Sequence, residues 1–485
     1  MQLYTDKDIN TLNEKIEDIT ESIESTRNEI LIPTKKQQMA AIQIVLDYVK
    51  EKKRIIYGGY AQNKLIVKKN KKDAFYKEDI IPDIDYYSFE PIIDVKHICN
   101  RLHDAGFKNI SGQPAQHKQT YTIFVEFENT CDISYVPTYI YHKIPYEEIN
   151  GIRYTSIPFV RIDMYIMLTD PFFSVFRWAK SFKRIFVMEK NYPFNKATRA
   201  LPIIDKFPTD KNDTNNINKL LDTVYNFLKN NDKVIVVGDY AYNQFLEESG
   251  IMNDKKLGKK YKILDINSYQ FVSLDYRNEG KKLIELLKNT HPTLAKDIII
   301  IEHYPFWTFN GYSAFIRYKD HKIVHIIHYN KKCIPIKKTK NIQIGAYDYT
   351  LLKNLIYGFW ARVLREKSKI NYHNIMTSHL VEMRNYYLDK NIKTMFDDTL
   401  FQEFIPTCIG ETIDRKREKF LEGKERYKKK QRSFRYEPEK DYQDPPESNY
   451  NFPNSSGNPI RNPKNLRITD TIPEEILKQK KRRIE

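Results

Sequence analysis

Three aspartates in apolar surroundings are the residues of this chain best suited to do chemistry. Asp83 and Asp85 stand one residue apart in IIPDIDYY (80–87), and Asp132 lies in TCDISYVP (130–137). Side chains two residues apart in a strand point to the same face, about 6.5–7 Å from each other. Like charges on a partly buried face weaken a fold unless a cation lies between them. The pattern therefore predicts a divalent metal site built from these three carboxylates.

Magnesium or manganese suits such a site, because hard cations prefer carboxylate, water and phosphate oxygens as ligands. With Asp132 supplied by a neighbouring strand, the site is expected to hold two ions about 3.5–4 Å apart. That spacing aligns the attacking and leaving oxygens of a phosphoryl transfer. The reaction class expected from the acids alone is metal-assisted phosphoryl transfer.

A pair of glycines precedes the acids along the chain. Gly58 and Gly59 follow an apolar run in RIIYGGYAQN (54–63). A turn without Cβ atoms lets backbone N–H groups approach a phosphate closely, and the N-terminus of a following helix adds partial positive charge. A strand, a Gly-Gly turn, two acids and then a third acid, in this order, favours a nucleotide-binding site.

The elements around these residues form an alternating pattern. Apolar positions at helical spacing predict two helices across 7–53, and a further helix follows the acids and ends at Gly106. Strands are expected at 54–57, 80–89, 120–127 and 131–136. The order predicts a small mixed α/β unit with acids on its central strands.

The same pattern occurs a second time. VIVVGDYAYNQF (234–245) matches 54–65 with Gly, Tyr, Ala and Asn in register, and DINSYQF (265–271) matches 83–89. Two matches in the same order favour an internal duplication. The fold class expected is therefore α/β (α+β) with two tandem copies of one unit.

Composition points to a polyanionic partner. The chain has 80 Lys and Arg against 63 Asp and Glu, a formal net charge of +17. Such a surplus favours nucleic acid first and a membrane surface second. No apolar window is long enough to span a bilayer and no leader is recognisable, so the sequence predicts a soluble intracellular protein without a signal peptide or transmembrane segment. The four cysteines, with no CxxC pair, suggest neither a disulfide framework nor a zinc module.

With these motifs placed, the chain resembles the polymerase-β-like nucleotidyltransferase superfamily. It is most similar to the poly(A) polymerase catalytic subunits of large nucleocytoplasmic DNA viruses, which include poxvirus, African swine fever virus and mimivirus enzymes, and closest to the mimivirus-like branch. The resemblance is strongest over 54–185. It implies that Gly58 and Gly59 hold the triphosphate of ATP and that Asp83, Asp85 and Asp132 bind two metal ions. Tyr60 departs from the family, which often has Ser after the glycine pair.

The resemblance also divides the chain into parts. The division expected is N-terminal helices (1–53), a catalytic nucleotidyltransferase domain (54–200), a degenerate nucleotidyltransferase-like domain (215–340), a helical segment (345–410) and a basic, partly disordered tail (411–485). This tail cannot bury enough apolar surface to fold alone, so it either stays mobile or lies along the body.

The second copy is expected to be inactive. Asp239 stands where the first copy has Gly59, placing a negative charge where a triphosphate would lie. Asn267 is the expected counterpart of Asp85, and His325 that of Asp132. Such a set of residues does not suit two divalent ions.

The function implied is template-independent addition of AMP from ATP to the 3′ end of viral mRNA by two-metal-ion catalysis. Arg177, Lys180 and Lys183 are candidate contacts to the ATP phosphates. The resemblance further implies a homodimer with no membrane contact, acting in the viral factory of the host cytoplasm and carried in the virion. Two alternatives stay open: another terminal nucleotidyltransferase, uridylyl- or CCA-adding, and a non-catalytic RNA-binding processivity scaffold.

Overall fold

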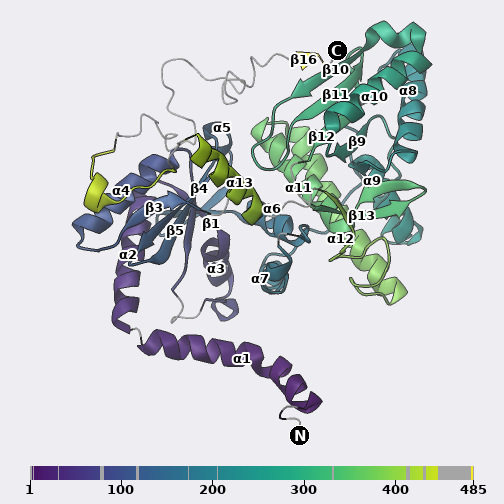
Figure 1. Ribbon diagram of the computed structural model, residues 1–485. Coiled ribbons are helices and arrows are strands. Elements are labelled where there is room, and N and C mark those ends of the chain that lie inside the picture. The colour runs from purple at the N-terminus through teal and green to yellow at the C-terminus, as the bar shows by residue number, and fades with distance from the viewer. Residues whose placement is uncertain are drawn as a thin grey trace. The chain divides into compact units, whose positions relative to one another are not determined.

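The computed structural model describes residues 3, 5–30, 32–76, 81–115, 119–172, 174–204, 206–329, 333–410, 415–429, 433–445 and 482–483 (Figure 1). The chain divides into two compact units. The first comprises 1–136, 145–156 and 431–450, and the second comprises 137–144, 157–430 and 451–485.

The first unit is a seven-stranded mixed sheet with helices. Its strands lie in the order β3-β4-β5-β2-β1-β7-β6. Its elements are α1 (Asp6–Ile30), α2 (Ile32–Glu51), β1 (Ile55–Tyr57), α3 (Gly58–Lys69), η1 (Lys71–Asp73), β2 (Ile84–Ser88), α4 (Pro91–Asp104), β3 (Ser111–Pro114), β4 (Thr120–Val125), β5 (Glu128–Tyr135), β6 (Tyr146–Ile149), β7 (Ile152–Thr155) and α14 (Pro438–Asp441). The two expected N-terminal helices and the helix before Gly106 are confirmed.

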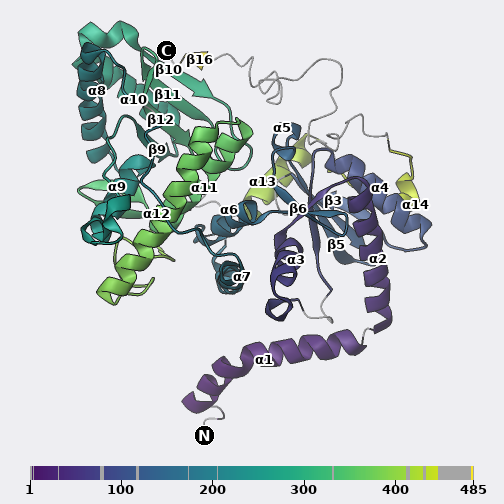
Figure 2. The same cartoon turned by 180° about the vertical axis from the view of Figure 1, so that it is seen from behind.

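Alternation along the central strands separates the core from the polar face. Ile84 and Tyr86 of β2, with Cys131 and Ile133 of β5, are fully buried in one apolar cluster. Helices α2 and α4 cover this face and contribute Val45, Val95 and their apolar neighbours (Figures 1 and 2). The residues between these positions in β2 and β5 therefore point to the opposite face, which leaves Asp85 and Asp132 outside the core.

A buried ion pair fixes the start of β1. Arg54 is 1% exposed, and its Nε and Nη2 donate hydrogen bonds of 2.9 and 2.6 Å to the carboxylate of Asp94 in α4. Nη2 also donates to Glu90 at 2.6 Å, while the Tyr48 hydroxyl of α2 donates to Asp94 at 2.8 Å. Helices α2 and α4 are thereby attached to the strand that leads into the Gly-Gly turn.

Part of the basic tail lies along the first unit. The backbone N–H of Gly112 donates to the carbonyl of Tyr436 at 2.8 Å, and the N–H of Tyr436 donates back at 2.9 Å. Tyr436 is 2% exposed, and its hydroxyl donates to Asn100 of α4 at 2.6 Å. Residues 433–445 therefore extend the first unit, whereas most of the segment expected to be disordered lies outside the described residues.

The second unit contains a nine-stranded sheet in the order β15-β13-β14-β8-β9-β12-β11-β10-β16. Its elements are α5 (Thr138–Tyr141), α6 (Ile157–Leu168), η2 (Val175–Arg177), α7 (Trp178–Asn191), α8 (Lys211–Lys229), β8 (Val234–Val237), α9 (Asp239–Ser249), η3 (Ile251–Asn253), η4 (Gly258–Lys260), β9 (Tyr269–Ser273), α10 (Tyr276–Thr290), η5 (Pro292–Asp297), β10 (Ile298–His303), β11 (Ser313–Tyr318), β12 (His321–His328), β13 (Cys333–Thr339), β14 (Ile342–Gly345), α11 (Tyr347–Val363), α12 (Lys367–Asn391), β15 (Cys408–Gly410), α13 (Arg415–Lys428) and β16 (Arg482–Arg483).

Strand order establishes the duplication. The core order β10-β11-β12-β9-β8-β14-β13 repeats that of the first sheet, strand for strand. The directions agree as well: β2 and β5 pair in parallel like β9 and β12, while β1 and β2 pair antiparallel like β8 and β9. The fold predicted from the sequence, a mixed α/β chain with two tandem units, is confirmed.

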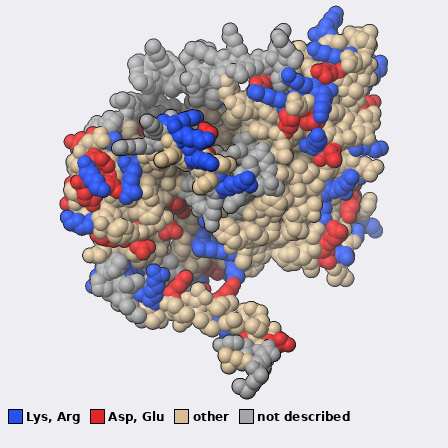
Figure 3. Space-filling model, viewed as in Figure 1, with Lys and Arg blue, Asp and Glu red and all other residues tan. Residues whose placement is uncertain are grey.

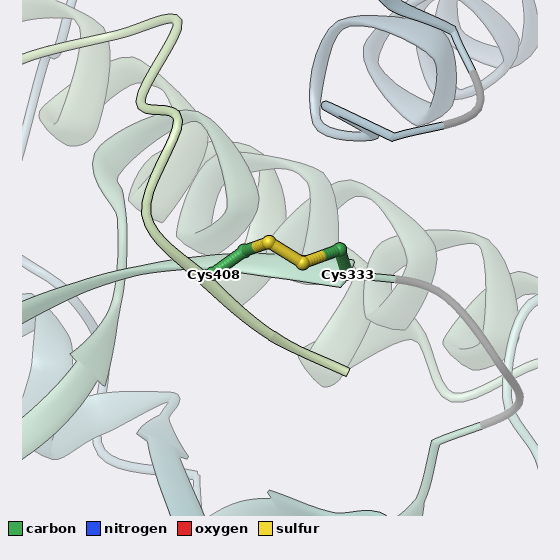
Figure 4. The surroundings of a disulfide bond; sticks show 2 residues. All are labelled: Cys333 and Cys408. Atoms are coloured by element: carbon green, nitrogen blue, oxygen red, sulfur yellow. A yellow bond between two sulfur atoms is a disulfide. The ribbon is translucent and has the colours of Figure 1, made fainter. Parts of the chain in front are cut away.

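The cysteines differ from the expectation. Cys333 of β13 and Cys408 of β15 form a disulfide, with their Cα atoms 5.3 Å apart (Figure 4). The expectation that the cysteines lack a disulfide is thus wrong for this pair. The two residues lie far apart in sequence, and the antiparallel pairing of β13 with β15 brings them together. Cys99 and Cys131 are buried thiols of the first unit.

Figure 3 shows acidic and basic side chains together on one face of the molecule, where Lys and Arg side chains lie among Asp and Glu side chains. Within the part of the chain that the structure describes, no helix is long and apolar enough to cross a membrane.

Candidate active site

Two of the three predicted acids face each other across neighbouring strands. Asp85 of β2 and Asp132 of β5 are direct partners in the parallel register, and Tyr57, the last residue of β1, pairs with Asp85 from the other side. Both acids are partly buried. Directly paired residues of neighbouring strands have Cβ atoms about 5 Å apart. The structure thus brings Asp85 and Asp132 to one face of the sheet, and a metal site there stays a prediction.

Gly58 holds the turn beside the acids. Helix α3 begins at this residue, which has a φ of +69°. A Cβ atom there would lie 2.4 Å from Oδ2 of Asp85, closer than real Cβ contacts allow. A glycine is therefore needed at this position for two reasons: the backbone is left-handed, and the carboxylate of Asp85 approaches too closely for a side chain. Gly59 follows in the first turn of α3, where backbone N–H groups lack intrahelical acceptors and can bind an anion.

Asp83 stands just outside the strand that was expected to contain it. β2 begins at Ile84, and Asp83 is exposed directly before it. The ladder with β1 cannot extend to Asp83, because its partner in that register would be Gly59, which lies in α3. The Asp83 carboxylate nevertheless lies close enough to Asp132 to raise the pKa of that carboxyl. Asp83 and Asp132 thus interact electrostatically.

The environment of Asp132 has opposing effects on its charge. Burial raises the pKa of Asp132, the hydrogen bond from Thr122 lowers it, and the Asp83 carboxylate raises it. The Thr122 hydroxyl of β4 donates to Oδ1 of Asp132 at 2.5 Å. Thr122 is directly opposite Asp132 in the antiparallel register. The sequence analysis did not identify Thr122. In the strand TYTIFV it points to the face opposite its neighbour Ile123, which is the face that bears the acids.

The donor set fits divalent cations. Carboxylate oxygens from adjacent strands are the ligands that Mg²⁺ and Mn²⁺ take in phosphoryl-transfer sites. Among the described residues, however, no group of three or more His, Cys, Asp or Glu side chains is already arranged as a ligand cluster. Carboxylates without a cation between them repel one another, and Oδ1 of Asp132 is held by Thr122.

A hydroxyl and aromatic cluster supports the acids on the same face. Tyr57 and Tyr87 stack with ring centroids 4.0 Å apart and an interplanar angle of 9°. The Tyr57 hydroxyl hydrogen-bonds with Ser134 at 2.8 Å, and Ser134 with Thr120 at 2.9 Å. These contacts join β1, β2, β4 and β5 and fix the strand ends that carry the acids.

Comparison with known proteins decides the family. Residues 43–174 match the family model "Poly(A) polymerase catalytic subunit", and residues 208–470 match "APMV, Putative poly(A) polymerase, catalytic subunit, C-terminal". The chain belongs to the viral poly(A) polymerase catalytic subunits. It is therefore an enzyme, a polynucleotide adenylyltransferase, as the family resemblance implied.

Two of the similar proteins span nearly the whole chain, and a third matches about a third of it. The "Putative poly(A) polymerase catalytic subunit" of Acanthamoeba polyphaga mimivirus is 32% identical to this chain. The match covers 96% of this chain and 84% of the mimivirus protein. A protein of African swine fever virus with that description is 28% identical over 36% of each chain. The crystal structure of the Megavirus polyadenylate synthase superposes with a TM-score of 0.82 at 32% identity, covering 96% of this chain and 94% of the other.

The register of this poly(A) polymerase subunit corrects one prediction about its second copy. Gln270, not Asn267, is the counterpart of Asp85, because Gln270 pairs with Val237 and His325 as Asp85 pairs with Tyr57 and Asp132. Ser268 then corresponds to Asp83.

Other predicted counterparts agree with the structure. His325 is the register equivalent of Asp132, as expected. Gly238, with a φ of +71°, lies against Gln270 as Gly58 lies against Asp85, so Asp239 does replace Gly59.

The three predicted basic residues lie in the second unit. Arg177 ends η2, and Lys180 and Lys183 lie in α7; all three are exposed. The acids belong to the first unit. Contact between these side chains and ATP therefore stays a prediction.

Proposed function

We propose that the first unit transfers AMP from ATP to the 3′ hydroxyl of RNA, with Asp83, Asp85 and Asp132 as ligands of two divalent ions. The observation that carries the proposal is the direct pairing of Asp85 with Asp132 beside a glycine that a side chain could not replace. When bound, the two cations would activate the attacking hydroxyl and stabilise the leaving pyrophosphate.

The residues of the chain divide the remaining work. Backbone N–H groups at the start of α3, at Gly58 and Gly59, would bind the triphosphate at a helix N-terminus. Thr122 orients Asp132 toward the site and favours its ionised form. Arg177, Lys180 and Lys183 are proposed to contact the ATP phosphates from α7 and the turn before it.

The second unit is proposed to be catalytically inactive. Its counterparts of the three acids are Ser268, Gln270 and His325, and none of them is a carboxylate. A hydroxyl, an amide and an imidazole do not form a hard, anionic site for two magnesium ions.

A primer-extension assay tests the reaction. Purified protein is incubated with labelled RNA, Mg²⁺ or Mn²⁺ and each nucleoside triphosphate separately. The proposal predicts a ladder with ATP and little extension with UTP or CTP. Extension with UTP, or with CTP followed by ATP, would favour the uridylyl- or CCA-adding alternatives. RNA binding without extension by any nucleotide would favour the scaffold.

A homodimer is also proposed, through α1. Five apolar side chains of this helix are between 42% and 62% exposed: Ile9, Leu12, Ile16, Ile19 and Ile23. Their spacing alternates between three and four residues, as in the seam of a coiled coil. A seam of this kind is self-complementary, so a second copy of the same helix is the partner it fits.

The site of action proposed is the viral factory in the host cytoplasm, with carriage in the virion. The viral origin of the relatives supports this assignment. Immunogold labelling of infected cells and of purified particles tests it, and labelling confined to the host nucleus would contradict it.

A further inference from the structure

The second unit contains a cavity at its copy of the active site. The cavity has a volume of about 540 Å³, within the range of small-molecule sites. Gly238, Gln270 and His325 line it, at the positions that Gly58, Asp85 and Asp132 occupy in the first unit. Loss of the carboxylates has therefore not closed the cleft.

Basic side chains from other elements line this cavity. Lys353 of α11 is 3% exposed, and its ammonium donates to Oδ1 of Asn310. Burial lowers the pKa of Lys353 to about 7. A buried lysine is unfavourable without an anionic partner, and an anion beside it would restore its positive charge. Arg317 and Lys322 also line the cavity.

The acidic residues of the wall are already engaged by protein donors. The Tyr372 hydroxyl donates to Oδ1 of Asp239 at 2.7 Å. Glu302 accepts a hydrogen bond of 2.8 Å from Nε of Arg277. Glu366 lies 3.0 Å from the ammonium of Lys369. The cavity therefore favours an anionic ligand rather than a cation.

One wall is aromatic. Phe306 and Trp360 stack with centroids 5.2 Å apart at an interplanar angle of 13°, and Tyr357 lies 6.3 Å from Trp360 at 28°. Flat aromatic surfaces bind nucleobases by stacking, without regard to sequence. A ligand that is both planar and anionic would use the aromatic wall and the lysines together.

Several polar atoms in the cavity wall have no hydrogen-bond partner among the described residues. They include Nε2 of His325, Oε1 of Gln270, the hydroxyl of Tyr357 and Nε of Arg317. His325 is 4% exposed, and burial together with the cations at Lys322 and Lys353 lowers its pKa, so its ring is neutral. Buried polar groups without partners are costly in a protein that binds nothing there. The four atoms lie beneath the surface of the cavity, so this wall is polar and its hydrogen-bonding groups are not all satisfied by the protein.

We propose that this cavity binds a nucleotide without a divalent metal, its base against Trp360 and Tyr357 and its phosphate beside Lys353. The nucleotide is either free in solution or part of an RNA strand, since both present the same base and phosphate. This site goes beyond the proposed function, because it requires no catalysis in either unit.

Equilibrium dialysis of the full chain in EDTA tests the proposal. The probes are labelled AMP, labelled ATP and an oligoadenylate with a 3′ hydroxyl, each measured separately and in competition. The proposal predicts about one nucleotide bound per chain, with the same affinity in the Asp132→Asn variant of the first unit. Tighter binding of AMP or ATP identifies a free nucleotide as the source, and tighter binding of oligoadenylate identifies RNA.

Variants locate the bound nucleotide. Lys353→Met is expected to weaken binding by at least about tenfold, because a charged hydrogen bond is lost. Lys281→Met, the same change at an exposed position of α10, is the matched control and should leave the affinity unchanged. Trp360→Leu, which removes the stacking surface, should weaken binding severalfold and gives an answer if Lys353→Met fails to fold.

Two results would overturn the proposal. One is the absence of binding by any probe in EDTA, with folding shown by circular dichroism. The other is binding that both Lys353→Met and Trp360→Leu leave unchanged. Neither depends on tailing activity, so failure of the proposed reaction and failure of this site are distinguishable.

Discussion

At Gly58 the absence of a single carbon determines the geometry of the site. Gly58→Ala adds a Cβ atom 2.4 Å from Oδ2 of Asp85 and forces alanine to a φ of +69°. The carboxylate must move, and displacement of a reacting group by about 1 Å costs about a hundredfold in rate. Single-turnover AMP transfer should therefore fall by at least that factor, with a stability loss of about 1 kcal/mol.

Gly151→Ala is the matched control for this change. Gly151 also has a positive φ, +79°, but its Cβ would meet the flexible end of Lys50 at 2.8 Å. It should lose similar stability and keep its activity. Equal losses of activity in the two variants would show that backbone strain, not displacement of Asp85, is responsible.

Thr122 is expected to tune the pH dependence of the reaction. Thr122→Val removes a hydrogen bond that lowers the pKa of Asp132, so the carboxyl protonates at higher pH. Metal binding requires the ionised form, which is lost as pH falls through the raised pKa. Relative to the wild type, the rate should therefore fall more at pH 6 than at pH 8.5.

The pH–rate profile measures this effect against a neighbouring threonine. The hydroxyl of Thr130 in β5 donates to the backbone carbonyl of Glu128 rather than to a carboxylate. Thr130→Val should therefore not shift the acidic side of the pH–rate profile. A Thr122→Val profile parallel to that of the wild type would contradict the role given to Thr122.

The sequence identified the acids of the first copy better than their counterparts in the second. Asp85 and Asp132 alternate with apolar residues, and alternation alone assigns them to the polar face of a sheet. In the second copy, DINSYQF was matched three residues out of register, because residue similarity does not show where a strand begins. The pairing of Gln270 with Val237 and with His325 determines which residues of the two copies correspond. This pairing joins residues far apart in the sequence, so local patterns do not predict it.

At the scale of elements, the ion pair of Arg54 holds the first strand to its helices. Arg54→Met leaves Asp94, which is fully buried, without its cation. Breaking a buried pair by removing one partner costs about 3–5 kcal/mol. Chemical denaturation should show a loss of that size in the free energy of unfolding.

Arg101→Met provides the comparison for Arg54. Arg101 pairs with Glu51 at 2.7 Å, but both side chains are more than one-third exposed. Exposed pairs contribute up to about 1 kcal/mol, so this variant should unfold nearly like the wild type. Similar losses in both variants would contradict the anchoring role of Arg54.

Elements with strong local patterns were predictable and those set by distant contacts were not. The helices around Pro33 and the central strands followed from periodicity. The disulfide between Cys333 and Cys408 depends on the pairing of two strands with 75 residues of sequence separation. Burial of Tyr436 against Gly112 likewise joins a tail of low apolar content to an edge strand. Neither contact has a local signature.

At the scale of the whole molecule, one fold occurs twice with different chemistry at the same position. The first copy presents carboxylates there, and the second presents an amide, an imidazole and nearby lysines. A duplicated unit can lose its metal ligands and keep its strand order. The buried face of each strand stabilises the fold, whereas the ligands lie on the opposite, polar face.

The helix α1 makes the oligomeric state testable. Ile16→Asp places a charge in the centre of the exposed apolar row and should convert a dimer into a monomer. Thr11→Asp adds the same charge away from the row and should leave the dimer intact. Light scattering at micromolar concentration measures both, and a monomeric wild type would refute the dimer.

Single-turnover AMP transfer by Asp85→Asn tests the central claim most directly. The measurement uses saturating ATP, RNA and Mg²⁺, with Asp47→Asn, an exposed aspartate of α2, as the control. The account predicts a loss of at least about a thousandfold for Asp85→Asn and no loss for Asp47→Asn. Transfer by folded Asp85→Asn at the wild-type rate would show that the paired acids of the first unit do not form the catalytic site.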